Sequence, residues 1–96
     1  MERETLEQAL DAVVPKFQRA CEQVRRLNAH IQTLQVRYDR AKRDNQRSFR
    51  YTLRLKIATV EGVRNTYYEY ACETGAQVED LQIQLATLYP DAIEIY

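Results

Sequence analysis

The side chains best suited to acid–base or nucleophilic chemistry are few and widely separated in this chain. Its two cysteines are Cys21 and Cys72, and His30 is its only histidine. Two cysteines this far apart match neither a metal-binding knuckle nor a disulfide framework. The chain also lacks a glycine-rich phosphate loop and a paired-histidine motif. We therefore expect no catalytic residue, no metal site and no cofactor, and two thiols that behave as small hydrophobic side chains.

Basic and aromatic residues are concentrated in the centre of the chain, where Tyr38, Phe49 and Tyr51 lie among lysines and arginines. Such a segment can bind nucleic acid, because cations contact phosphates and aromatic rings stack on bases. The alternative is a solvated face that pairs with acidic segments of a neighbour, and a sequence pI near 6.6 favours this alternative. The basic patch consists of Arg37, Arg40, Lys42, Arg43, Arg47, Arg50, Arg54 and Lys56.

The net charge of zero conceals a strong segregation of charge along the chain. Residues 1–14 carry a net charge of −3, residues 15–56 carry +9, and residues 57–96 carry −6. Charge blocks of this kind act on association more than on fold. We expect copies of the chain to associate in a staggered manner, with the acidic end of one copy beside the basic middle of another, or to bind an acidic protein partner.

Apolar residues recur at alternating steps of three and four along two long segments. This spacing places one stripe of side chains on a helix, and the stripe must pack against another helix to leave water. The first ladder runs from Leu6 to Ala41 and the second from Ile57 to Leu88, and the two are out of phase. We expect an interaction seam that contains Leu27, Ile31, Leu34 and Tyr38 from the first ladder and Tyr67, Val78, Leu81 and Leu85 from the second.

The phase change lies close to the sequence Asp44-Asn45-Gln46. Residues 16–61 contain neither Gly nor Pro, and as one helix they would extend over about 69 Å. Such a segment either folds back or is a rod that packs against another chain. Asp and Asn favour turns over helix interiors, which predicts a reversal at residues 44–46. The alternative is that Asn45, at a seam position, fixes the register of a parallel dimer.

Residues 48–58 carry a conflicting signal, because apolar and polar residues alternate there almost perfectly. This alternation is typical of a half-buried strand. It leaves open an α+β alternative, with a coiled-coil helix followed by a β-hairpin at about 48–72 that turns near Gly62.

Proline and glycine positions suggest the boundaries of the helical segments. Pro15 favours a helix start or a sharp kink near Val14, and Pro90 ends the second segment at Leu88 or Tyr89. Thr74 and Gln77 have the spacing of a capping box, so a break near Gly75 would give a third, short helix. We expect a short helical lead at 1–14, a coiled-coil or hairpin domain at 15–89 with a phase change at 44–57, and a tail at 90–96.

The pattern as a whole predicts an all-α protein, built as a long helical hairpin or a coiled coil. The expected function is non-enzymatic: a protein–protein interaction, scaffold or oligomerisation module that binds a protein partner or itself. The alternative is binding of nucleic acid or another anionic surface through the basic segment 37–56. No apolar run is long enough for a membrane span, and the first residues lack a signal peptide, so we expect an intracellular location, cytoplasmic or nuclear.

Overall fold

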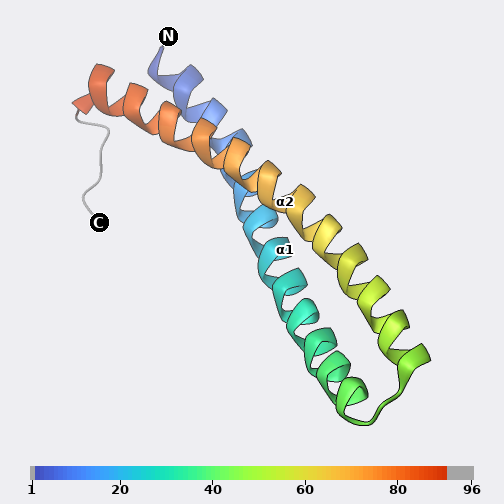
Figure 1. The fold of residues 1–96 in the computed structure, drawn as a ribbon. Helices are drawn as coiled ribbons and strands as arrows, with labels where there is room; N and C mark the ends of the chain where they lie inside the picture. The colour runs from blue at the N-terminus through green and yellow to red at the C-terminus, as the bar shows by residue number, and fades with distance from the viewer. Residues whose placement is uncertain (1, 91–96) are drawn as a thin grey trace. The chain divides into compact units, whose positions relative to one another are not determined.

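The computed structural model describes residues 2–90, which form two α-helices joined by a short turn (Figure 1). Helix α1 spans Arg3–Arg43 and helix α2 spans Arg47–Leu88. The prediction of an all-α helical hairpin is thereby confirmed. The alternative with a β-hairpin at about 48–72 is wrong, because those residues belong to α2 and the described part of the chain contains no strand.

The strand-like alternation near residue 53 arises from two opposite faces of one helix. Leu53 and Ile57 are buried, whereas Tyr51 and Leu55 are 64% and 52% exposed. Residues four apart share a helix face, and residues two apart lie on opposite sides. Of the five odd-numbered apolar residues from Phe49 to Ile57, two are therefore buried and three are exposed.

The chain divides into two compact units, each of which contains a segment of both helices. Unit 1 consists of Met1–Ala20 and Glu69–Tyr96, and unit 2 consists of Cys21–Tyr68. Each unit has its own buried side chains.

Unit 2 is an antiparallel helix pair closed by the turn. Two side-chain contacts define its register: Arg54 donates a hydrogen bond to the Tyr38 hydroxyl, and Arg64 donates one to the Asn28 amide oxygen. In each pair the two residues are equally far from Gln46, as expected for a reversal centred there. The core of unit 2 consists of Leu34, Ala41, Leu53 and Ile57, with Ile31, Tyr38 and Val60 packed against it.

Unit 1 buries a separate set of small and medium-sized side chains. From α1 these are Leu6, Val13 and Ala20, which are seven residues apart and so lie on one face. Ala71 and Thr74 are the buried residues of α2 in this unit. The Thr74 hydroxyl donates to the Tyr70 carbonyl at 2.9 Å, which satisfies this buried polar group within its own helix.

The turn between the helices depends on a left-handed residue. Asn45 has a φ of 58°, a conformation that few residues other than Gly and Asn adopt readily. The Gln46 N–H donates to the Ala41 carbonyl at 2.9 Å and the Asn45 N–H donates to the Lys42 carbonyl at 3.3 Å. These two bonds form a Schellman motif, which satisfies carbonyls at the end of α1. Asn45 therefore ends a helix instead of occupying a dimer seam.

The helix boundaries differ in part from those suggested by Pro and Gly. Helix α1 begins at Arg3 and contains Pro15 in its interior, so no helix start is found near Val14. Helix α2 continues past Gly75, so no third, short helix begins at Thr74. It ends at Leu88, two residues before Pro90. Residues 91–96 of the predicted tail lie outside the described residues.

Replacing Leu34 by Ala should destabilise unit 2. Leu34 is 3% exposed and belongs to the core cluster, and Leu→Ala substitutions at such positions cost about 2–5 kcal/mol. The control is Val36→Ala on the same helix, because Val36 is 55% exposed and should change the free energy of unfolding by no more than about 0.5 kcal/mol. Urea denaturation followed by circular dichroism measures both. Equal losses from the two variants would contradict the assigned core.

Substitutions at Asn45 should follow the preference for a left-handed conformation. Asn45→Val should lower the free energy of unfolding by about 1–2 kcal/mol, because a β-branched side chain is strained at positive φ. Asn45→Gly should leave it unchanged or raise it by up to about 1 kcal/mol. The same denaturation assay compares them, and a Val variant as stable as the Gly variant would show that the turn does not have this geometry.

Candidate functional site

The predicted seam residues occupy different environments. Leu34 is buried, and Ile31 and Tyr38 pack against it in unit 2. Leu27 is half-buried, whereas Tyr67 is 38% exposed. In unit 1 the half-buried predicted residues are Val78, Leu81 and Leu85. The first ladder thus finds packing partners in the same chain, which removes the original reason to expect that this seam binds another molecule.

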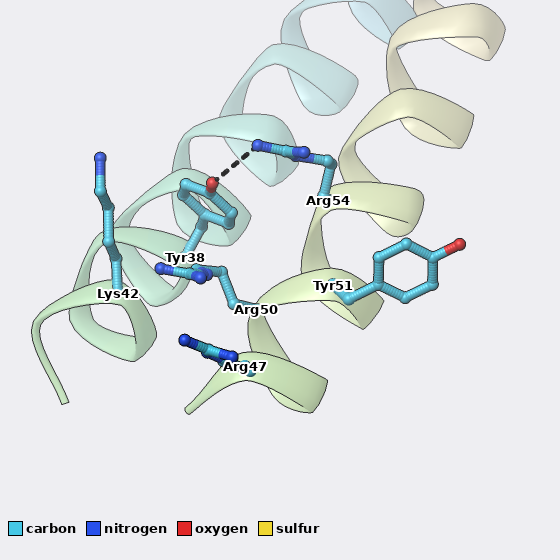
Figure 2. A pocket seen from close by; sticks show the side chains of 6 residues that line it. All are labelled: Tyr38, Lys42, Arg47, Arg50, Tyr51 and Arg54. Carbon is cyan, nitrogen blue, oxygen red and sulfur yellow. Dashed lines mark hydrogen bonds between the residues drawn. The ribbon is translucent and has the colours of Figure 1, made fainter. Parts of the chain in front are cut away.

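The turn end of unit 2 carries an open cleft of about 380 Å³. Side chains of both helices line it, four of them cationic (Figure 2). Both helices supply cations because basic residues lie in the last turns of α1 and the first turns of α2. The lining residues are Tyr38, Lys42, Arg47, Arg50, Tyr51 and Arg54.

One arginine of this cleft, Arg54 on α2, contacts a tyrosine of α1. A guanidinium nitrogen of Arg54 donates to the Tyr38 hydroxyl at 3.2 Å, and the Arg54 guanidinium carbon lies 5.9 Å from the centre of the Tyr38 ring. Both the hydrogen bond and the cation–π contact restrict the guanidinium. Figure 2 shows that the Tyr51 ring points away from Tyr38, so the two rings do not form a joint platform for stacking bases.

The remaining members of the predicted basic patch do not belong to this cleft. Arg37 and Arg40 line a separate hollow of about 270 Å³ on α1, together with Thr33 and Val36. Arg43 and Lys56 line neither of these two hollows. The structure therefore brings together only half of the eight residues, namely Lys42, Arg47, Arg50 and Arg54.

The two units carry opposite charge. Unit 2 contains eleven basic and four acidic residues, a net charge of +7, whereas unit 1 contains three basic and ten acidic residues, a net charge of −7. Within residues 2–90, the ion pairs found join residues four apart on α1, Arg3 with Glu7 and Arg26 with Glu22. No member of the basic patch forms an ion pair with a described residue, so these charges remain available to a partner.

A second surface lies on the outer face of α2, opposite the core of unit 2. We call it the outer stripe: Tyr51, Thr52, Leu55, Thr59, Gly62, Val63 and Thr66. All seven residues are exposed and none is charged. Our sequence analysis did not identify this stripe, because Tyr51 and Leu55 belong to the alternating run that suggested a strand. The heptad spacing of Thr52, Thr59 and Thr66 is the pattern that would have revealed it.

The three threonines of the outer stripe satisfy their hydroxyl groups within the helix. Thr52, Thr59 and Thr66 each donate to the carbonyl four residues earlier, at 3.1, 2.9 and 3.2 Å. Such bonds are a common option for Thr in helices. A partner can therefore cover the stripe without leaving these hydroxyl donors unpaired, which would cost about 1–3 kcal/mol each.

Other kinds of site have little support in the described residues. Residues 2–90 contain no cluster of three or more His, Cys, Asp or Glu side chains placed to bind a metal ion. Cys21 and Cys72 are free thiols, the first partly buried and the second exposed. Neither helix is both long enough and apolar enough to cross a membrane in the part of the chain described.

Comparison with known proteins adds no relative: no protein-family model, curated protein or solved structure matches the chain significantly. The functional argument therefore depends on the surfaces described above.

Proposed function

We propose that this chain is a non-enzymatic self-association module, in which a folded hairpin binds a second copy of itself. The observation that carries the proposal is the opposite charge of the two units, +7 and −7. In a side-by-side arrangement the basic unit of each copy can face the acidic unit of the other, which gives two attractive contacts. Complementary potentials of this kind accelerate association and select the partner.

The outer stripe supplies the apolar contact that charge alone does not provide. Exposed ion pairs contribute only about 0–1 kcal/mol each, whereas burial of a Leu or Val side chain contributes about 1.5–3 kcal/mol. Leu55 and Val63 are 52% and 43% exposed in the hairpin. Their remaining exposed surface is available to a partner helix, and no charged residue interrupts the stripe.

Binding of a polyanion such as single-stranded nucleic acid is the second candidate, and the cationic cleft at the turn favours it. Lys42, Arg47 and Arg50 have no acidic partner among the described residues, so they can contact phosphates. Stacking is less well supported, because Arg54 already contacts the Tyr38 ring and Tyr51 points away from it. We therefore place this function second.

Light scattering at low and high salt tests the proposed function. The chain should be a dimer at about 0.05 M salt and shift toward monomer at about 1 M, where the Debye length falls to about 3 Å. Leu55→Asp should abolish the dimer and leave the helical content unchanged. Val36→Asp is the matched control, because Val36 is also about half exposed but lies on α1 away from the outer stripe; this variant should still dimerise.

A monomer at both salt concentrations would overturn the proposed function. A labelled single-stranded RNA added at low salt separates the second candidate. RNA binding that is lost in an Arg47→Glu, Arg50→Glu, Arg54→Glu variant and retained in Leu55→Asp, together with a monomeric protein, would establish the polyanion function in its place.

A further inference from the structure

The open cleft at the turn brings four cationic side chains together without a carboxylate. All the residues that line its volume of about 380 Å³ belong to unit 2. One of the cations comes from α1, and the other three are arginines of α2 that extend toward α1 (Figure 2). The acidic residues closest to the cleft in sequence are Asp39, Asp44 and Glu61. None of these three lines the cleft or forms an ion pair with one of its cations.

The arginines of the cleft occupy positions that helix α2 itself disfavours. Arg47 and Arg50 lie in the first turn of α2, which contains no acidic residue. The positive end of the helix dipole repels cations there. Arg50 and Arg54 are four residues apart, and like charges at this spacing also destabilise a helix. Because no described carboxylate pairs with these arginines, a bound anion would relieve a repulsion that the hairpin leaves uncompensated.

The charge of the cleft indicates which kind of anion would match it. A phosphate group near pH 7 carries about 1.5–2 negative charges and three acceptor oxygens, so about two such groups balance the cations. A carboxylate carries a single charge. The planar fork of donors on each arginine also matches phosphate oxygens. The Tyr38 hydroxyl accepts a hydrogen bond from Arg54 and keeps its own hydrogen, which it can donate to a ligand.

The size of the cleft favours a compact ligand over a nucleic-acid strand. A volume of about 380 Å³ lies near the lower end of the range for small-molecule pockets, about 300–1,000 Å³. Proteins that bind single strands contact about 4–16 nucleotides and stack bases on aromatic rings. In this chain the Tyr51 ring points away from Tyr38, and Arg37 and Arg40 line a separate hollow. The converging cations are thus confined to a small site beside the turn.

We infer that this cleft binds a compact ligand with two or more adjacent phosphate groups, either a free molecule or the headgroup of a lipid. The four cations contact the phosphate oxygens, and the Tyr38 hydroxyl supplies a further donor. This inference goes beyond self-association, because it uses neither the outer stripe nor the charge of unit 1. It also differs from the nucleic-acid candidate, since it requires neither base stacking nor an extended track of cations.

Isothermal titration calorimetry with inorganic tripolyphosphate at about 0.15 M salt tests the inference. We expect one tripolyphosphate per chain, and at least about tenfold weaker binding of inorganic phosphate and of citrate. Arg50→Gln should weaken tripolyphosphate binding by about tenfold or more, since it removes a charged hydrogen-bond donor from the site. The matched control is Arg43→Gln, which removes the same charge from the end of α1 without changing the lining of the cleft. It should weaken binding by less than about threefold, and circular dichroism checks that both variants keep their helical content.

Absence of tripolyphosphate binding, or equal losses from Arg50→Gln and Arg43→Gln, would overturn the inference. Single-stranded RNA provides a second check. If RNA binds more tightly than tripolyphosphate and loses affinity equally from Arg37→Gln and Arg50→Gln, the site is an extended track for a strand and the compact cleft is wrong.

Vesicles distinguish the two sources of the phosphate groups. Phosphatidylcholine vesicles that contain phosphatidylinositol bisphosphate, and that bind the parent chain but not Arg50→Gln, would assign a lipid headgroup. Tripolyphosphate binding without vesicle binding would assign a free molecule. Leu55→Asp should bind tripolyphosphate as tightly as the parent chain, whether or not the parent dimerises. A failure of the proposed self-association therefore leaves this test intact, and a failure of tripolyphosphate binding leaves self-association untouched.

Discussion

The reversal at Asn45 is the constraint on which the packing of unit 2 depends. Helix α1 ends at Arg43. The chain then turns back, with a φ of 58° at Asn45 and the Gln46 N–H donating to the Ala41 carbonyl. The reversal brings Leu34 against Leu53 and Ile57 in the same chain. Without it, the apolar stripe of α1 would have to pack against another molecule. The backbone conformation of this turn thus allows the part of the first ladder in unit 2 to form a core within the chain.

Because the seam of unit 2 is filled by the chain itself, the proposed binding of a partner has to use surfaces outside this seam. The outer stripe is uncharged and exposed, and its threonine hydroxyls are satisfied within α2. The basic turn end and the acidic unit 1 supply charge of opposite sign. These surfaces, and not the buried core of unit 2, remain available to a partner.

The helical fold and the position of the turn could be predicted from sequence, because the 3-4 spacing of apolar residues and the turn preference of Asp and Asn are both properties of short segments. The strand alternative at 48–72 failed because periodicity over a few residues cannot tell one alternating strand from two faces of a helix. Leu53 is buried only because α1 lies opposite it, and that contact is tertiary. Pro15 favoured a helix start or a sharp kink near Val14, and of these the helix start is wrong, because α1 begins at Arg3 and contains Pro15.

The candidate site was less accessible to sequence reasoning than the fold. The eight basic residues form one cluster in the sequence, yet helix geometry separates Arg37 and Arg40 from the cleft at the turn. The contact of Arg54 with Tyr38 depends on the register of the hairpin, which a ladder alone does not specify.

Energy transfer within single molecules tests the fold-back of the chain most directly. Dyes are attached to an Arg25→Cys, Tyr68→Cys chain with the native cysteines replaced by serine, since both positions are exposed and lie almost equally far from Gln46. Transfer should be high even at picomolar concentration, where each chain is alone. Low transfer there, as expected for a continuous helix that separates the two positions by about 65 Å, would contradict the hairpin and return the first ladder to an intermolecular seam.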